Sequence, residues 1–287
     1  MGEVSVCILI HGKRNYFRAG RQAALSVLEN SDFDLFLVLG PGPDLRLNAT
    51  PRLRCHALAQ ETGHHYRARP FLRKFHALQA CLENGRHRWL LLMDADTIVA
   101  RTISRRMIEE ALAGRSLGMV EQTTILGSAM ARQDFLRHYV QHTLSWFASG
   151  AIPPSLDDFC YYNSGVVLGR REAMQEFVGW ALETLDRNRG DHRVGSHMIT
   201  DQDYFQYWTN NVRPTSCISL PWHWNHCEHW DDGFPRPEAR ILHFSNFCLA
   251  PTLGQVVRMS LLRRCGMGET RNPGLLWKLL GWAVMRP

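Results

Sequence analysis

The sequence lacks the features that mark disulfide-linked, membrane-spanning or low-complexity proteins. Its eight cysteines include no Cys-x-x-Cys pair, and several lie in apolar runs where buried thiols are ordinary. No stretch reaches the ~18 uncharged apolar residues that a membrane-spanning helix needs. No basic leader followed by an apolar segment opens the chain either. We therefore expect a globular, cytoplasmic protein with reduced cysteines.

The net positive charge is concentrated in one segment. Lysine and arginine outnumber aspartate and glutamate by 33 to 27, a formal net charge of +6. Residues 255–287 hold six basic residues against the single acid Glu269, and so account for +5 of that +6. Because the rest of the chain is almost neutral, the charge gives no reason to expect nucleic acid as a partner.

The first forty residues alternate strand and helix patterns. Val4–Ile10 is a compact apolar run, residues 16–28 have apolar positions at helical spacing, and residues 33–39 form a second apolar run closed by a Gly-Pro-Gly-Pro turn. Such a β-loop-α-β unit pairs its strands in parallel, and its first loop lies at the ligand-binding edge of the sheet. The sequence therefore predicts an α/β fold.

That first loop is a candidate nucleotide site. His11 and Tyr16 are placed to hold a base or a phosphate. The loop has neither a Gly-x-Gly-x-x-Gly nor a Walker pattern, so Lys13 and Arg14 fit solvated loop charges equally well.

An apolar run that ends in two acids carries the strongest functional signal. Residues 89–93 fit a strand buried on both faces, and Asp94 and Asp96 follow at its carboxyl end, where α/β sheets bind ligands. Residues i and i+2 of an extended chain share one side, so both carboxylates can reach one hard divalent ion, which can hold a diphosphate. The structural alternative is that Asp96 only caps a turn near Thr97.

Two chemistries fit this Asp-x-Asp pattern. One is the metal and nucleotide-sugar site of GT-A glycosyltransferases, and the other is the haloacid-dehalogenase-like phosphatase motif, with Asp94 as nucleophile. The phosphatase nucleophile should lie on the first strand of its domain, whereas 93 residues of α/β pattern precede Asp94 here. The order of the elements therefore favours the transferase.

A cationic helix precedes the acidic strand. Pro70 opens a segment with apolar residues at helical spacing. Arg69, Arg73 and Lys74 are candidates to stabilise charge on a leaving diphosphate, and we include Lys74 in the nucleotide-sugar site. The alternative, solvated helix charges, must hold for at least two of the three by periodicity.

Three later patterns place polar groups at element ends. Asn163-Ser164-Gly165 is a turn that opens a strand, and Asn163 can both donate to and accept from sugar hydroxyls. Asp201-Gln202-Asp203 opens a helix, where acids also serve as ordinary caps. His243 ends a short strand, and a lone histidine there is more often structural than a ligand.

Taken together in this order, the motifs Asp94-Ala95-Asp96, Asn163-Ser164-Gly165, Asp201-Gln202-Asp203 and His243-Phe244 resemble the pattern of glycosyltransferase family 8. That family includes glycogenin and bacterial lipooligosaccharide galactosyltransferases. It has a GT-A fold, uses UDP-sugars with Mn²⁺ and retains the anomeric configuration. The resemblance spans roughly residues 4–247.

The resemblance implies a role for each matching residue. Asp94, Asp96 and His243 are the expected ligands of Mn²⁺ (or Mg²⁺), and Asn163 is the expected sugar contact. Asp201 is expected to grip donor-sugar hydroxyls, with Gln202 beside the reacting carbon. One departure is plain, because the family usually continues from its histidine to a glycine and a phosphate-binding lysine, and residues 244–251 hold neither. A non-catalytic sugar-binding or nucleotide-binding module therefore stays open as an alternative.

We thus expect one GT-A domain over residues 1–250, with a Rossmann-like, mostly parallel mixed sheet flanked by helices, followed by a helical tail over residues 251–287. The expected partners are a UDP-sugar and a glycan, glycolipid or other acceptor. The tail combines leucine and tryptophan with positive charge, which suits peripheral contact with a membrane surface, or else packing on the domain.

A histidine-rich and tryptophan-rich segment, residues 222–230, offers two further interpretations. The histidines and Cys227 could bind zinc, although no cysteine pair lies nearby to complete four ligands. Trp222 and Trp224 could stack on an acceptor sugar, with core packing as the alternative.

Overall fold

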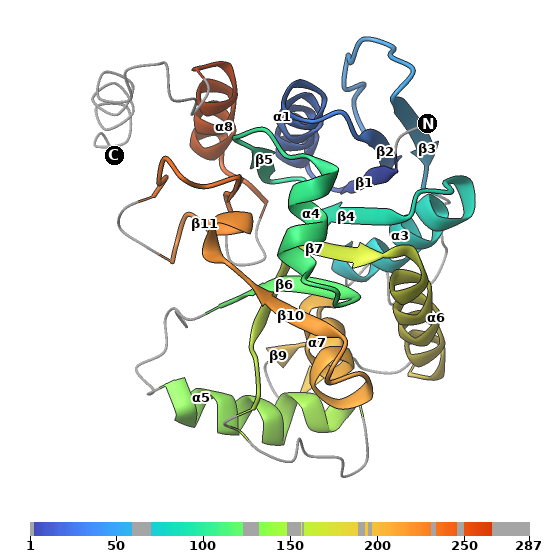
Figure 1. The fold of residues 1–287 in the computed structure, drawn as a ribbon, viewed down its shortest axis with the longest axis vertical. Coiled ribbons are helices and arrows are strands. Elements are labelled where there is room, and N and C mark those ends of the chain that lie inside the picture. The colour runs from blue at the N-terminus through green and yellow to red at the C-terminus, as the bar shows by residue number, and fades with distance from the viewer. Residues whose placement is uncertain are drawn as a thin grey trace.

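The computed structural model describes residues 3–58, 70–122, 132–147, 156, 158–188, 193–194, 197–230, 234–245 and 250–265. A seven-stranded sheet forms its centre, in the order β10-β6-β7-β4-β1-β2-β3 (Figure 1). Its strands are β1 (Val4–Ile10), β2 (Asp34–Leu39), β3 (Leu53–Ala57), β4 (Trp89–Met93), β6 (Leu117–Glu121), β7 (Tyr162–Arg170) and β10 (Cys217–Leu220).

The sheet is mixed but mostly parallel, as predicted. Strands β4, β1, β2 and β3 are parallel neighbours, and β10 is parallel to β6. Only β7 runs against both of its neighbours, β4 and β6. The described residues therefore form the α/β sheet that the alternating sequence pattern predicted.

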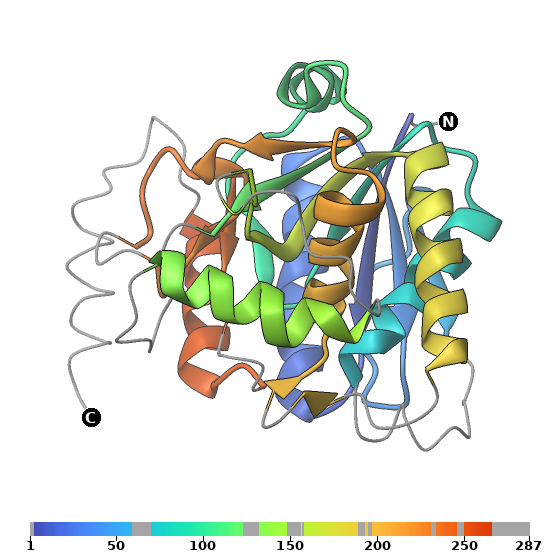
Figure 2. The same ribbon diagram turned by 90° about the horizontal axis from the view of Figure 1, so that it is seen from below.

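Helices cover both faces of this sheet. The helices of the described residues are α1 (Arg14–Asn30), α3 (Arg73–Asn84), α4 (Arg105–Leu112), α5 (Arg132–His138), α6 (Arg171–Arg187), α7 (Asp201–Tyr207) and α8 (Leu253–Cys265). Helices α1 and α4 pack on one face, and α3, α6 and α7 pack on the other. Figure 2 shows α6 and α7 side by side, where Phe177 and Phe205 stack with ring centroids 4.0 Å apart.

Strand β4 is buried on both faces, as its unbroken apolar sequence predicted. Trp89, Leu91 and Met93 join the core under α1, whereas Leu90 and Leu92 join the core under α3 and α6. The alternation follows from the two-residue period of an extended chain. It sets β4 in the middle of the molecule, with its carboxyl end facing the site.

The described residues form two smaller sheets as well. Strands β11 (His226–Cys227), β12 (Ile241–His243) and β5 (Thr97–Val99) form a three-stranded sheet, in which β12 runs antiparallel to β5. Strands β8 (Arg193–Val194) and β9 (His197–Met198) pair with each other. The strand that ends in His243 therefore belongs to a sheet of its own rather than to the central one.

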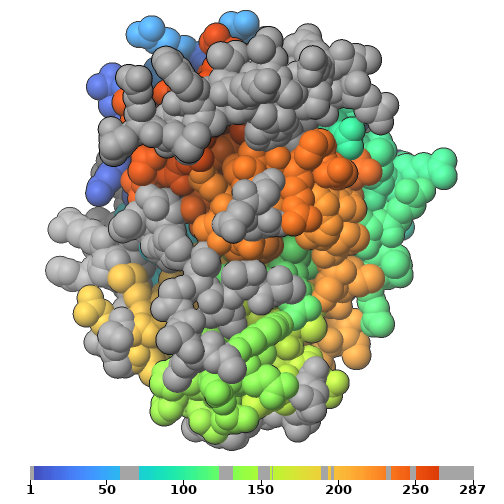
Figure 3. Space-filling model, turned by 90° about the vertical axis from the view of Figure 1, so that its left-hand side faces the viewer, coloured from blue at the N-terminus to red at the C-terminus, as the bar shows by residue number. Residues whose placement is uncertain are grey.

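Helix α8 packs along α1. Met259 and Leu262 are buried in a cluster with Ala19 of α1, and Arg263 pairs with Glu29. In Figure 3 residues of this C-terminal region, coloured orange and red, share one side of the molecule with green α5. The remainder of the predicted tail, residues 266–287, lies outside the described residues. Within the described part of the chain, no helix is both long and apolar enough to cross a membrane.

Candidate functional site

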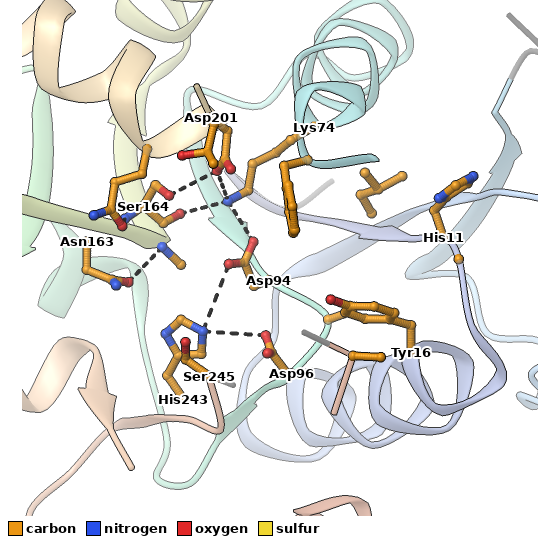
Figure 4. A pocket seen from close by; sticks show the side chains of 18 of the residues that line it. His11, Tyr16, Lys74, Asp94, Asp96, Asn163, Ser164, Asp201, His243 and Ser245 are labelled. Carbon is orange, nitrogen blue, oxygen red and sulfur yellow. Dashed lines mark hydrogen bonds and ion pairs between the residues drawn. The ribbon is translucent and has the colours of Figure 1, made fainter. Parts of the chain in front are cut away.

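A cavity of about 440 Å³ opens where β1 and β4 end (Figure 4). It brings together residues that are up to 241 positions apart in the sequence, from Leu9 to Ala250. All the residues predicted for the site line it: His11, Tyr16, Lys74, Asp94, Asp96, Asn163, Asp201, Gln202 and His243.

Three of these residues form a group that could hold a metal ion. His243 Nε2 lies 3.4 Å from Asp96 Oδ1 and 3.9 Å from Asp94 Oδ2. One ligand atom of each side chain lies within 4.8 Å of the others, and within the described residues no other group of three such side chains comes as close. Two carboxylate oxygens and an imidazole nitrogen form a donor set that fits Mn²⁺.

The turn after β4 sets the two acids in place. Thr97 donates to the Asp94 carbonyl twice, from its backbone N–H at 3.2 Å and from Oγ1 at 2.7 Å, so the chain reverses directly into β5. Strand β12 then pairs with β5, and His243 comes opposite Thr97. This pairing carries His243 to the acids, although the two strands are about 140 residues apart.

Gly165 makes room for the His243 ring. A Cβ atom at this position would overlap with Cε1 and Nδ1 of His243, both of which lie inside contact distance. The Gly165 carbonyl also accepts a hydrogen bond of 2.9 Å from the Asp94 N–H. The glycine of the Asn-Ser-Gly turn is therefore required by the close approach of a side chain from the small sheet.

Lys74 lies in the floor of the cavity. Its Nζ is 2.6 Å from Asp94 Oδ1 and 2.7 Å from Asp201 Oδ2, and it donates to the Ser164 carbonyl at 2.9 Å. Burial alone lowers the pKa of Lys74, but Asp201 and Asp94 outweigh it and raise the pKa above its usual value. The interpretation of Lys74 as a solvated helix charge is therefore wrong, since its side chain is buried.

The two acids of this group differ in charge environment. Burial raises the pKa of Asp94 and outweighs the opposing effect of Lys74. Burial also acts on Asp96, but the adjoining His243 ring outweighs it and lowers the pKa of this carboxyl. For His243 burial opposes the charged ring, whereas Cys227 and Asp96 raise its pKa well above the usual value. The acids thus share a small volume with the Lys74 ammonium group and the His243 ring.

The opposite rim comes from the first loop. Arg73 contacts His11 Nε2, and burial together with Arg73 lowers the pKa of His11, so the neutral ring accepts from the guanidinium. Tyr16 and Lys13 line the same rim. Arg73 therefore turns toward the rim and not toward the acids, and Arg69 lies outside the described residues.

Helix α7 presents its first turn to the cavity. Asp201 Oδ2 accepts from Ser164 Oγ at 2.9 Å as well as from Lys74, and Gln202 Oε1 lies 3.5 Å from the Ser164 N–H. Asp201 is only 7% exposed. Its carboxylate is therefore held by fixed donors at the edge of an open space.

Asp203 has a different environment from Asp201. Together with Thr200 it forms a capping box, accepting from the Thr200 N–H at 2.7 Å. Tyr139 OH donates to its other oxygen, and His197 Nε2 lies 3.1 Å away. For Asp203 the capping alternative is the one that the hydrogen bonds support.

The tryptophan and histidine segment contributes nothing to the lining of this cavity. Trp224 is 2% exposed and packs in the core, so it cannot be a sugar platform, whereas Trp222 is 38% exposed and lies under Arg236. Burial lowers the pKa of His226 to about 4. Within the described residues these histidines form no metal-binding group.

Sequence reasoning missed several polar residues around the site. Ser164 belongs to the Asn163-Ser164-Gly165 motif, but nothing in the sequence indicates that its hydroxyl contacts Asp201. Asn225, which lies 3.1 Å from His243 and 2.8 Å from Asn163, stood in the segment considered for zinc. Tyr139 lay in a stretch without a readable pattern. Only tertiary contacts identify these three.

Comparisons with known proteins agree with this geometry at the level of the fold. No protein-family model and no curated protein sequence matches the chain. Among solved structures, the crystal structure of the galactosyltransferase LgtC in complex with donor and acceptor sugar analogues is similar with a TM-score of 0.55. The similarity covers 96% of this chain and 99% of that one at 12% sequence identity. The chain therefore has a glycosyltransferase fold of the GT-A type.

Proposed function

We propose that this chain is a metal-dependent glycosyltransferase that moves a hexose from a nucleotide-diphosphate sugar, with UDP as the nucleotide, to a glycan, glycolipid or other acceptor. The observation that carries this proposal is the group Asp94, Asp96 and His243 beside one cavity of a glycosyltransferase fold. Membership of glycosyltransferase family 8, and with it retention of the anomeric configuration, is part of the same proposal.

The proposed metal is Mn²⁺ (or Mg²⁺), held by Asp94, Asp96 and His243. Bound there, it supplies a Lewis acid that neutralises the diphosphate as the glycosidic bond breaks. The chain supports this assignment because two acids and one imidazole converge, while Gly165 leaves the space that the imidazole occupies.

Lys74 is proposed to serve the leaving group. Its Nζ already bridges the metal-site acid Asp94 and Asp201, so a diphosphate held at the acids comes within reach of a cation. A fixed ammonium group stabilises charge that develops on a leaving phosphate without reorganising at the moment of reaction.

The donor itself is proposed to lie across the cavity. His11 on the first loop and Tyr16 in the first turn of α1 would contact the nucleotide, and Asn163 and Asp201 would hold sugar hydroxyls. Gln202 would lie beside the anomeric carbon. The support for this direction is that the first loop and α7 lie on opposite sides of Asp94 (Figure 4).

A non-catalytic sugar-binding module is the second candidate. The observation that favours it is the missing glycine and lysine after His243. The phosphatase alternative is weaker, because Asp94, its nucleophile, follows the fourth strand of the chain and not the first. Turnover of a nucleotide sugar would distinguish a transferase from the binding module and from the phosphatase.

We also propose a cytoplasmic location and peripheral contact with a membrane through the basic tail. The support is compositional, since residues 271–287 combine Arg271, Lys278 and Arg286 with several leucines and tryptophans. Cations near an anionic surface contribute roughly 1 kcal/mol each.

A panel of UDP-sugars and GDP-sugars tests the donor class. Each sugar nucleotide is added with Mn²⁺, and its effect on the melting temperature and the release of free nucleotide are both measured. We expect one or a few UDP-hexoses to stabilise the protein and to be turned over. Stabilisation without nucleotide release, with or without sugar acceptors, would favour the binding module. If neither occurs with any sugar nucleotide, the proposed function is wrong.

A further inference from the structure

A buried amide lies behind the His243 ring. Asn225 follows the turn Trp222–Trp224 and is 0% exposed. Its Oδ1 lies 3.1 Å from His243 Nδ1, and its Nδ2 lies 2.8 Å from Asn163 Oδ1. A buried amide and a histidine ring can meet only with matched donors and acceptors. The contact therefore determines which ring nitrogen carries hydrogen.

A backbone donor fixes the orientation of both amides. The Gly165 N–H lies 2.9 Å from Asn163 Oδ1, and a backbone N–H can only donate, so Asn163 must present its oxygen there. That same oxygen faces Asn225, which must therefore present its NH₂ group. If the Asn163 amide were flipped, its NH₂ group would face the Gly165 N–H, which is also a donor. If the Asn225 amide were flipped, its oxygen would face the Asn163 oxygen, which is also an acceptor.

The remaining atom of Asn225 is then its oxygen, which faces His243 Nδ1. An amide oxygen can only accept, so Nδ1 must carry a hydrogen in every protonation state that keeps this contact. The nitrogen left to bind a metal is Nε2. It is the nitrogen that faces Asp96 at 3.4 Å and Asp94 at 3.9 Å.

Cys227 offers a rival arrangement. Its Sγ lies 3.4 Å from His243 Nδ1, and a thiol could donate to a bare Nδ1 and leave the hydrogen on Nε2. The bare nitrogen would then face the oxygen of Asn225 at 3.1 Å, which opposes two acceptors in a buried site. The thiol has another acceptor in Asn225 Oδ1, 3.8 Å away.

We propose that Gly165, Asn163 and Asn225 form a hydrogen-bond relay that holds the hydrogen of His243 on Nδ1, which makes Asn225 a positioning residue for the metal ion. This inference rests on the proposed metal function of His243. It also restricts Asn163, because an oxygen with two donors inside the protein leaves only the NH₂ group to contact a donor sugar.

The first test reads the ring hydrogen directly, without metal. Protein labelled with ¹⁵N in its histidine rings should show a slowly exchanging proton bonded to Nδ1 of His243, identified by its loss in His243→Asn. The relay predicts that this signal persists in Cys227→Ala and is lost in Asn225→Leu. Loss in Cys227→Ala with persistence in Asn225→Leu would overturn the relay.

The second test measures the affinity for Mn²⁺ alone, by electron paramagnetic resonance of the free ion with the full chain. Asn225→Leu should weaken binding by about 10–100-fold, as other losses of a partner behind a metal ligand do. Asn163→Ala removes the relay at its other end and should also weaken binding. No sugar is present, so a sugar-contact role of Asn163 cannot cause that loss. Cys227→Ala is the matched control and should bind within about threefold of the unchanged protein.

The outcomes separate the relay from the proposed function. If the unchanged protein binds Mn²⁺ and both asparagine variants bind it equally well, the relay is wrong and the metal site stands. If the unchanged protein binds no Mn²⁺, the metal function fails, and the relay's role fails with it. Thermal unfolding of each variant establishes that it is folded, and Asn163→Ala carries the test if Asn225→Leu does not fold.

Discussion

Asp94 and Asp96 stand one residue apart, yet they have different partners. Asp94 pairs with Lys74, and Asp96 pairs with His243. A sequence pattern of two acids gives both the same predicted role, because the spacing states only that they share a side. The partners come from distant elements, α3 and β12, so their different charge environments follow from tertiary structure alone.

At the scale of single residues, the first prediction concerns Lys74. Lys74→Met leaves Asp94 and Asp201 close together without their cation. Breaking a buried ion pair costs roughly 3–5 kcal/mol, and because the Asp94 side chain is 33% exposed we expect a loss of about 2–4 kcal/mol of unfolding free energy. Urea unfolding measures it. Lys13→Met, at an exposed position of the same cavity, is the control and should change stability by less than about 0.5 kcal/mol. Equal stability of the two variants would show that Lys74 balances no buried charge.

His226 carries a prediction about pH. Burial, helped by Arg236, lowers its pKa to about 4 in the folded protein, against about 6.5 in an unfolded chain. Between these values the unfolded state binds more protons, so His226 contributes stability that is present above about pH 6.5 and lost as the pH falls toward 4. His226→Phe keeps the ring contacts to Trp222 and Phe234 and removes the titration. The stability difference between the two proteins should therefore change across this window, and a constant difference would contradict the prediction.

At the scale of elements, strands with long apolar runs were predictable. β1 and β4 lie where the apolar runs placed them, and the parallel pairing of β1 with β2 was confirmed. The small sheet was not predictable, because β5 and β12 are three residues each, and a short strand ending in His243 does not indicate which strand it pairs with. His243 was expected at the end of a short strand, as the structure has it, but the pairing of that strand with β5 was not predicted.

The same reason explains the residues that sequence analysis missed. Asn225 and Asn163 are 62 positions apart, and Tyr139 and Asp203 are 64 apart. Contacts between residues so far apart produce no periodic pattern in the sequence, because the partner of each side chain lies on another element. Candidate residues at element ends could be named from the sequence, but their donors and acceptors could not.

The next prediction compares two substitutions in the first turn of α7, Asp203→Asn and Asp201→Asn. Asp203→Asn weakens the capping box and the hydrogen bond from buried Tyr139. A lost cap costs about 1 kcal/mol and a hydrogen bond to a charged group about 1.5–3 kcal/mol, so we expect a loss of about 2–4 kcal/mol in stability. Turnover per folded molecule should remain. Asp201→Asn should do the reverse, keeping the fold and losing turnover. Loss of turnover in folded Asp203→Asn would instead make Asp203 a reacting group.

At the scale of the whole molecule, the C-terminal region consists of helix α8, which the structure describes, and of residues 266–287, which lie outside the described residues. Helix α8 buries Val256, Met259 and Leu262 against the domain, so the packing alternative holds for these side chains. Leu253, Val257 and Leu261 on the same helix are exposed. The described part of the tail thus belongs to the packed structure through one face.

Two truncations test this division. Removing residues 272–287 should leave a folded protein that no longer sediments with anionic liposomes, if those residues supply the membrane contact. Removing residues 253–287 should in addition expose the cluster around Ala19 and Phe244 and lower the melting temperature. Unfolding of the shorter deletion would place the final leucines in the core. Retained liposome binding in that variant would remove the tail from the membrane contact.

The central claim is that Asp94, Asp96 and His243 hold the metal that a nucleotide-sugar transfer needs. The most direct measurement is the rate of UDP release from UDP-hexoses, with Mn²⁺ or with EDTA, for the unchanged protein and for Asp96→Asn. Loss of a metal that stabilises the leaving group by several kcal/mol, at about 1.4 kcal/mol for each factor of ten, predicts a fall of at least about 100-fold in either case. Release that continues at the same rate in EDTA, or in Asp96→Asn, would contradict the metal-centred account.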